Sequence, residues 1–433
     1  MNMELLSSSV YPIVRDNADF YASYALAPDG SPASESMEDS GTLSMPYTCA
    51  QEACDCRDGT SWYWRWGKFV GIPLPNMTTE SIEFSKRNGG NGIWDTSAGE
   101  HNAHADIAFA SASLRKAIDY STVLGVDENK RSMWQSVLDR MPDYPTQTLH
   151  WTQSNGTSIV VGSELSGKPM LVEAQAGGTP ALEGNASQGT NSTGGQQCID
   201  PPCSTLIWPW CNVEYPITNF AMMWPTDELA AAAAADPDMM AIAKTTVYGL
   251  NNYTGFTFAG SKTPWANNNG FGLSWPPAVR VSEGSDAEQL LQLMATAAVR
   301  QTSTNGIVKT GGGCLENMGA TAAINEMLLQ SYTGVLRVFP VWSKDVGPAS
   351  FEALRARGAF IVSASMDIAG NVSPIIVVSE QGTSPCVFES PLSWGVGVPA
   401  VRSAGATVPV SKRSDGAFEF STTAGATYTI STQ

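Results

Sequence analysis

Hydrophobic residues in the first part of the chain recur every three or four positions, which is the spacing of an amphipathic helix. They follow this spacing over residues 5–25 and again, most clearly, over residues 102–124. A further helix is expected after Asp127, whose side chain can cap it, and it should end before Pro142. The last two of these helices are predicted to form a helical hairpin.

Helical composition returns in the middle of the chain. Thr226 is expected to cap the alanine-rich run that follows it, and the helical pattern continues after Asp236 as far as Leu250. Two more helices are predicted over residues 285–300 and 318–331.

Two long stretches between the helices lack any such period. Residues 26–100 and 145–213 are rich in small and polar residues, and we interpret them as inserted loops, the second with one small hairpin. The first stretch contains the aromatic run SWYWRW at residues 61–66. We interpret this run as a buried anchor for the loop, with a sugar-stacking platform as the alternative.

After Gly334 the hydrophobic period changes from that of a helix to the period of two that strands show. Short β-branched or alternating runs follow one another between Gly, Ser and Pro turns: VLRVFPVW, RGAFIVSASMDIA, SPIIVVSEQ, CVFES, AFEFSTT and ATYTIS. The predicted fold class is therefore mainly α with a β domain. A helical body should occupy residues 1–334 and a β-sandwich-like domain residues 335–433.

The composition excludes several classes of function. With 42% hydrophobic and 15% charged residues, the chain has enough apolar surface and little enough charge to fold. Its 41 acidic and 24 basic residues give a formal net charge of −17, which repels a phosphate backbone and argues against nucleic-acid binding. No apolar run reaches the roughly 18 residues of a membrane-spanning helix, so no membrane partner is expected.

The cysteines indicate an oxidising compartment. Six of the eight fall in two clusters, Cys49, Cys54, Cys56 and Cys198, Cys203, Cys211, while Cys314 and Cys386 stand apart. No Cys-x-x-Cys pair occurs, so we expect disulfides in the two loops and no metal site.

Other features of the chain bear on the same question of compartment. Asn-x-Ser/Thr sequons occur at Asn76, Asn155, Asn185, Asn191, Asn252 and Asn371, and they favour an extracellular or secretory location. The first residues have no signal-peptide pattern, and we therefore expect that Met1 is not the natural beginning of the protein.

Candidate chemistry rests on carboxylates, since no nucleophile elbow, phosphate loop or metal motif occurs. His101 and His104 have a spacing that allows a metal, but we favour two polar side chains at a helix start and predict no metal and no cofactor. Three loop glutamates remain. Glu52 lies between cysteines, Glu100 directly precedes the strongest helix, and Glu316 follows a run of three glycines that lets the backbone approach a ligand closely.

Glycoside hydrolysis fits this inventory of residues. It needs one carboxylic acid that protonates the leaving oxygen and a second carboxylate that activates water or attacks carbon. The 13 tryptophans can stack on the apolar faces of sugars. We choose Trp265, in an Asn-rich loop, as the candidate stacking residue.

Specific segments resemble a known family. GATAAINEMLLQSYTGVLRVFP at residues 319–340, followed by SFEALRARGAFIVSASMD at residues 350–367, strongly resembles the end of the catalytic barrel and the start of the C-terminal β-domain in glycoside hydrolase family 95. That family comprises inverting α-L-fucosidases and related α-galactosidases. Residues 11–24 and 104–145 look like helices of the same barrel.

The resemblance implies a fold of which this chain would hold only part. The family has an N-terminal β-domain, a helical linker, an (α/α)6 barrel of six hairpins and a C-terminal β-domain. The chain is then expected to be a partial (α/α)6 barrel followed by the C-terminal domain. An incomplete ring would expose large apolar helix faces, so a missing N-terminal half or a partner chain is an expected partner besides the carbohydrate substrate.

The resemblance also implies roles for individual residues. Order along the chain makes Glu52 the counterpart of the catalytic acid, with Glu100 as the rival. The family's general base is the aspartate of an Asp-Gly-Asn-x-Gly segment, and the matching stretch at residues 315–319 keeps Asn317 and Gly319 but has Glu316 one position displaced.

These roles make the expected function specific. Asn317, Gly319, His101 and Trp265 are the candidate substrate contacts. The expected function is inverting hydrolysis of a terminal sugar, of fucose or galactose type, from a glycan or polysaccharide. The carboxyl groups of Glu52 and Glu316 should then lie roughly 6.5–9.5 Å apart. The alternative is a non-catalytic carbohydrate-binding or structural homologue that has lost the acid–base pair.

Overall fold

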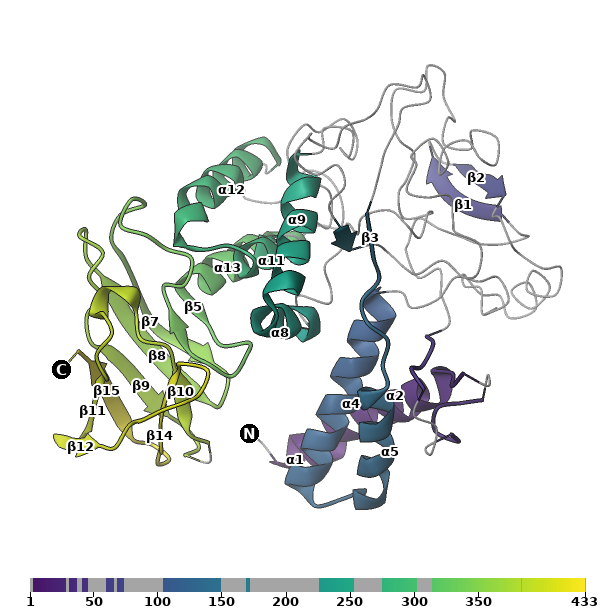
Figure 1. The fold of residues 1–433 in the computed structure, drawn as a ribbon, viewed down its shortest axis with the longest axis horizontal. Helices are drawn as coiled ribbons and strands as arrows, with labels where there is room; N and C mark the ends of the chain where they lie inside the picture. Colours follow the sequence, from purple (N-terminus) through teal and green to yellow (C-terminus); the bar gives the residue numbers. More distant parts are fainter. Residues whose placement is uncertain are drawn as a thin grey trace. The chain divides into compact units, whose positions relative to one another are not determined.

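The computed structural model describes residues 3–28, 31–36, 41–45, 60–65, 68–73, 104–148, 169–171, 226–252, 275–301, 314–382 and 384–432. The chain divides into two compact units, Met1–Phe256 and Thr257–Gln433 (Figure 1). The domain boundary predicted at residue 334 lies inside the second unit, in whose described part three helices precede the sheets. Among the described helices, none has the length and apolar character to cross a bilayer.

The first unit is built on three packed helices. One continuous helix comprises α1 (Met3–Leu5), the π-helical segment η1 (Leu6–Val10) and α2 (Tyr11–Tyr24). It packs against α4 (His104–Leu124), which in turn packs against α5 (Glu128–Asp139). Their shared core includes Ala18, Ile107, Leu114 and Trp134, each at most 2% exposed. The predicted helices and the hairpin of α4 and α5 are therefore confirmed.

Two predicted helix caps are wrong. Asp127 has a left-handed backbone (φ 49°) and makes no side-chain cap to α5, because its Oδ2 accepts a hydrogen bond from the Tyr11 hydroxyl at 2.7 Å. The residue at the start of α8 (Glu228–Ala235) is Asp227 instead of Thr226, also left-handed (φ 66°) and also without a side-chain cap.

Strands occur in both regions that the sequence predicted as loops. A two-residue connection joins β1 (Thr60–Arg65) to β2 (Lys68–Pro73), so the aromatic run is the first strand of an antiparallel hairpin. Aromatic residues favour strands, and here this preference outweighs the turn residues that surround the run. The second region contains the predicted small hairpin, made by β3 (Thr146–Thr148) and β4 (Pro169–Leu171).

Two further described helices of the first unit attach to these elements. Glu228 of α8 forms an ion pair with Arg115 of α4 at 2.9 Å. The next helix, α9 (Pro237–Asn252), holds β4 through the Thr246 hydroxyl, which accepts a hydrogen bond from the Leu171 backbone N–H at 2.9 Å.

The described part of the second unit begins with helices. These are α11 (Trp275–Arg280), a short 3-10 turn at Gly284–Asp286, α12 (Ala287–Gln301) and α13 (Cys314–Leu328). The predicted helix over residues 285–300 is thus confirmed. The last helix starts four positions before the predicted Met318 and ends earlier than predicted, because β5 (Leu329–Gln330) follows at once.

The C-terminal part is a sheet domain. Its six-stranded antiparallel sheet has the order β12-β11-β15-β9-β8-β7, and a three-stranded sheet has the order β10-β14-β13. In chain order the strands are β7 (Ala349–Ala356), β8 (Phe360–Met366), β9 (Ile375–Ser379), β10 (Cys386–Phe388), β11 (Ala400–Ser403), β12 (Ala406–Val408), β13 (Ser411–Lys412), β14 (Phe418–Phe420) and β15 (Thr427–Ser431). A small pair of strands, β5 and β6 (Arg337–Val338), precedes them.

Both sheets contribute to one hydrophobic core. Alternate residues of β8 and β9 are buried, as the predicted period of two requires. Val362 and Val377 from the large sheet and Phe388 and Phe420 from the small one are each at most 2% exposed. The predicted change from helices to a β domain is confirmed, and the strands begin within the predicted region or immediately before it.

Candidate functional site

The structure covers only part of the predicted site. Glu52, Glu100, His101 and Trp265 lie outside the described residues. The separation between the carboxyl groups of Glu52 and Glu316 therefore stays a prediction. The six clustered cysteines also lie outside the described residues, so their disulfides stay a prediction as well.

The three remaining site residues share the beginning of one helix. Glu316, Asn317 and Gly319 all lie within the first two turns of α13, so Glu316 is part of a helix and not of a loop as predicted. Gly319 is buried. The first turn of a helix has free backbone N–H groups and a partial positive charge, which favour a carboxylate or another negatively charged group there.

A buried ion pair fixes α13 against α11. Arg280 at the end of α11 donates from Nη2 to Glu326 Oε1 at 2.7 Å and from Nε to Oε2 at 3.2 Å. The Arg280 side chain is only 4% exposed, and its guanidinium carbon lies 4.3 Å from the centre of the Tyr332 ring. A bidentate pair of this kind is both strong and directional. Glu326 is thereby paired with Arg280 and positions α13 against α11.

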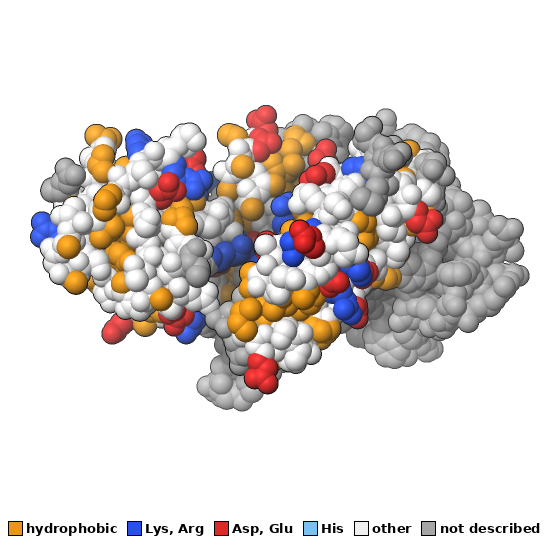
Figure 2. Space-filling view, turned by 90° about the horizontal axis from the view of Figure 1, so that it is seen from below, with side chains coloured by type: hydrophobic (Ala, Val, Ile, Leu, Met, Phe, Trp, Pro, Cys, Tyr) orange, Lys and Arg blue, Asp and Glu red, His pale blue; other side chains and the backbone are white. Residues whose placement is uncertain are grey.

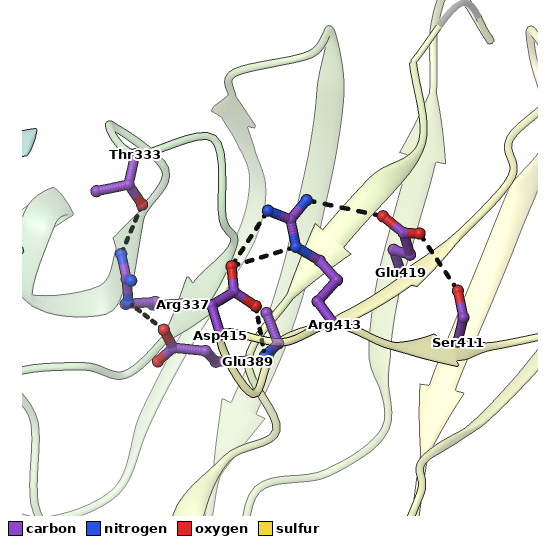
Figure 3. Close-up of polar contacts among 8 residues, drawn as sticks. Thr333, Arg337, Glu389, Ser411, Arg413, Asp415 and Glu419 are labelled. Carbon is purple, nitrogen blue, oxygen red and sulfur yellow. Dashed lines mark hydrogen bonds and ion pairs between the residues drawn. The ribbon is translucent and has the colours of Figure 1, made fainter. Parts of the chain in front are cut away.

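A second group of charged residues lies on the sheet domain (Figure 3). Arg337 of β6 donates from Nε to Glu389 Oε1 at 2.8 Å and from Nη1 to the Thr333 hydroxyl, also at 2.8 Å. Since Glu389 directly follows β10, this ion pair connects the small β5–β6 pair to the three-stranded sheet.

In the same view, Arg413 lies between two carboxylates. Its Nε and Nη2 each lie 3.2 Å from Asp415 Oδ2, and its Nη1 lies 3.7 Å from Glu419 Oε2. Glu419 also accepts a hydrogen bond from the Ser411 hydroxyl at 3.3 Å. All three ionic side chains are between 37% and 47% exposed, so water screens these pairs and each contributes at most about 1 kcal/mol.

This surface group has a structural role. Each of its carboxylates is paired with an arginine. The charged residues of Figure 3 therefore join loops and strands.

Two other ionisable groups have shifted pKa values with clear causes. Burial raises the pKa of the Cys386 thiol to about 12, so this free cysteine stays protonated and unreactive. Hydrogen bonds from the side chain and the backbone N–H of Asn371 lower the pKa of Asp367. Asp367 thus organises the turn between β8 and β9.

Metal chemistry gains no support in the described part of the chain. No group of three or more His, Cys, Asp or Glu side chains there could hold a metal ion. His104, the first residue of α4, is completely buried. His101, which would bind the same metal as His104 if a metal site existed, lies outside the described residues.

Sequence reasoning missed two of the polar contacts between described helices, one in each unit. One is the pair of Arg280 and Glu326. The other is Asp19, which accepts a hydrogen bond from Trp134 Nε1 at 3.0 Å and forms an ion pair with Lys130 Nζ at 2.6 Å. The spacing of Lys130 and Trp134, four residues apart on one helix face, was the available signal that a single acid could bind both.

Comparison with known proteins identifies no family. No protein-family model matches the chain, and no curated protein matches it either.

Proposed function

We propose that the chain is a divergent glycoside hydrolase related to family 95, which hydrolyses a terminal sugar of fucose or galactose type with inversion. In this proposal the helices belong to a partial (α/α)6 barrel. The substrate is a glycan or polysaccharide, and no cofactor takes part.

One structural observation carries the proposal. The two segments that resemble the family correspond to consecutive elements: residues 319–340 run through most of α13, β5 and β6, and residues 350–367 through β7 and β8. A helix therefore leads directly into a sheet domain, in the order that the resemblance implies for the end of a barrel and the domain behind it. The packed helices α2, α4 and α5 support the proposal in the same way, since the other two resembling segments, 11–24 and 104–145, contain them.

The position of Glu316 suits the role of general base. A base that activates water must be ionised, and the N-terminal turn of a helix stabilises a carboxylate. Glu316 would take a proton from the attacking water while Glu52, with Glu100 as its rival, protonates the leaving oxygen. Asn317, Gly319, His101 and Trp265 would contact the sugar.

Replacing the proposed base tests this function. The full chain would be assayed with a panel of aryl glycosides that includes the α-L-fucoside and the α-galactoside, and NMR would identify the first anomer released. Glu316→Gln should lower turnover by about 10²–10⁴-fold, as loss of a general base does. The matched control is Glu352→Gln, because Glu352 is an exposed glutamate on β7 at the edge of the large sheet.

The outcomes separate the two readings of the sequence. Turnover with inversion that Glu316→Gln removes and Glu352→Gln leaves unchanged supports the proposal. Binding of a sugar without any turnover, measured by calorimetry with the same panel, would replace it by the carbohydrate-binding alternative. If the chain shows neither turnover nor binding, the result contradicts both the enzymatic proposal and a carbohydrate-binding role. It would leave the structural homologue as the remaining alternative.

The proposal includes an oxidising compartment outside the cell or in the secretory pathway. Alkylation without reduction, followed by mass measurement, tests it. We expect the six clustered cysteines to resist alkylation because they form disulfides, and Cys386 to react only after denaturation because it is buried. Six reactive thiols in those clusters would contradict this part of the proposal.

A further inference from the structure

The helix formed by α1, η1 and α2 is apolar on two opposite faces. On one face Leu6, Tyr11, Ala18 and Ala22 are at most 4% exposed, and this face packs against α4. At 3.6 residues per turn, Ile13 and Phe20 point about 150° away from Ala18. A helix that is apolar on both sides is normally covered on both sides.

The second face is open to solvent. Leu5 is 54% exposed, Ile13 65% and Phe20 50%, and Met3 and Val10 beside them are also exposed. Figure 2 shows hydrophobic side chains gathered on the visible face of the first unit, between charged ones. We call the row of Leu5, Ile13 and Phe20 the outer stripe.

The π-helical segment places the three residues in one row. In a regular helix Leu5 and Ile13, eight positions apart, would point about 80° away from each other. The π-helical turn of η1 holds one residue more than an α-helical turn. Leu5 and Ile13 therefore point in nearly the same direction, as two residues seven positions apart do in a regular helix. Ile13 and Phe20 are seven apart in the regular helix α2. The outer stripe thus has an almost equal spacing of two turns on each side of Ile13.

This spacing makes the stripe complementary to itself. If a second copy is laid against it in the antiparallel direction, with a two-fold axis at Ile13, Ile13 meets Ile13 and Leu5 of each copy meets Phe20 of the other. Ser9 of one copy then lies opposite Asn17 of the other, so that polar positions also face polar ones. An interface of this isologous kind is the commonest in homodimers.

The area sets the strength of such a contact. Five side chains at these exposures present on the order of 400 Å² per copy, or about 800 Å² in total, which is below the roughly 1,200–2,000 Å² of stable specific interfaces and falls among weak, transient contacts. The formal net charge of −17 on each copy opposes association at low salt. Both facts point to a weak contact that strengthens with ionic strength and concentration.

We propose that the outer stripe is the interface of a weak antiparallel homodimer, in which α1, η1 and α2 of one copy pack against the same helix of a second copy. The inference goes beyond the proposed enzymatic function and does not depend on it. Sedimentation velocity of the full chain tests it over a range of concentrations and salt. We expect a dissociation constant of about 10–100 µM that falls as salt is raised.

Matched substitutions decide whether the stripe is the interface. Ile13→Glu places two carboxylates opposite each other at the axis and should raise the dissociation constant at least about tenfold. Ile368→Glu is the control, because Ile368 is 71% exposed in the turn between β8 and β9 and lies off the stripe. Leu5→Glu and Phe20→Lys should each weaken the dimer. The double variant should restore it, because in the antiparallel arrangement the new glutamate faces the new lysine.

Three results would overturn the inference. These are a monomer at every concentration and salt, a dimer that Ile13→Glu leaves unchanged, or a double variant no better than the single ones. The exposed side chains contribute little to the core, so circular dichroism should show the same helix content for all variants. If another part of the chain or a different partner covers the outer stripe, the chain will stay a monomer at every concentration and salt, and the inference is overturned.

Discussion

At the scale of single residues, Gly382 occupies a position that admits no side chain. Its backbone is left-handed (φ +65°), and a Cβ atom built there would lie 2.1 Å from the backbone nitrogen of Ala424. Backbone cannot move aside as the end of a flexible side chain can. We therefore expect Gly382→Ala to lower the free energy of unfolding of the second unit by about 3 kcal/mol or more, measured by urea denaturation.

Gly405 provides the control for this prediction. It has a similar φ of +81°, but a Cβ atom there would meet nothing within 4 Å. Gly405→Ala should therefore cost only the backbone strain of about 1–2 kcal/mol. If both variants lose the same free energy of unfolding, backbone strain and not the contact with Ala424 explains why position 382 requires glycine.

At the scale of elements, the pair of Arg280 and Glu326 determines how α11 meets α13. Replacing Glu326 by Gln leaves a guanidinium that is only 4% exposed without its carboxylate, and breaking a buried pair typically costs about 3–5 kcal/mol. Because Glu326 is itself 18% exposed, we expect a loss near the lower end of that range in the unfolding of the second unit. Glu352→Gln, on the exposed edge strand, should change stability by less than about 0.5 kcal/mol.

The contact between α2 and the start of α5 predicts a dependence on pH. Burial and the hydrogen bond to Asp127 raise the pKa of Tyr11 above its ordinary 10.0, and burial raises that of Tyr21 to about 12. A raised pKa in the folded state means that stability is fully present below pH 10 and is lost as the pH rises toward the folded values. The urea midpoint of the first unit should therefore fall above about pH 10.

Tyr11→Phe separates this effect from other alkaline effects. It removes the titrating hydroxyl and its hydrogen bond to Asp127, which contributes about 1 kcal/mol. The variant should be less stable near pH 7 and should lose less stability between pH 9 and 11 than the unaltered chain. If the stability of the two proteins falls equally between pH 9 and 11, Tyr11 does not cause the loss of stability at alkaline pH.

The elements also show which parts of the fold a sequence reveals. The period of hydrophobic positions was enough to predict α4, β8 and β9, because one face of each element is buried along its whole length. It could not reveal α11, whose six residues are all buried, so that no alternation of polar and apolar positions exists. Two prolines near its start, Pro276 and Pro277, also resemble a loop, although the first turn of a helix tolerates proline.

Short strands and polar contacts were missed for a related reason. β12 and β13 have no buried residue, so they carry no hydrophobic signal, and only their pairing with neighbours defines them. For the candidate site, the glycine-rich surroundings of Glu316 were enough to single it out, but they did not predict that it lies inside α13. Contacts between distant residues, such as Asp19 with Trp134 or Arg280 with Glu326, depend on how helices pack and leave little trace in local sequence.

At the scale of the whole molecule, each compact unit has a core of its own. Among the described residues, the core around Trp134 draws only on Met1–Phe256, and the core around Val377 only on Thr257–Gln433. Cooperative unfolding requires that the loss of one core destabilises the other. Since neither core includes residues of the other unit, we expect two separate calorimetric transitions.

Two substitutions assign these transitions. Trp134→Ala removes a completely buried ring and its hydrogen bond to Asp19, so it should lower only the transition of the first unit, by about 3–5 kcal/mol. Gly382→Ala should lower only the transition of the second unit. A single transition that both variants shift would show that the units unfold as one, and the energetic coupling between them would then have to come from contacts outside both cores. Additive effects in the double variant would support independence, because substitutions that share no partner normally add.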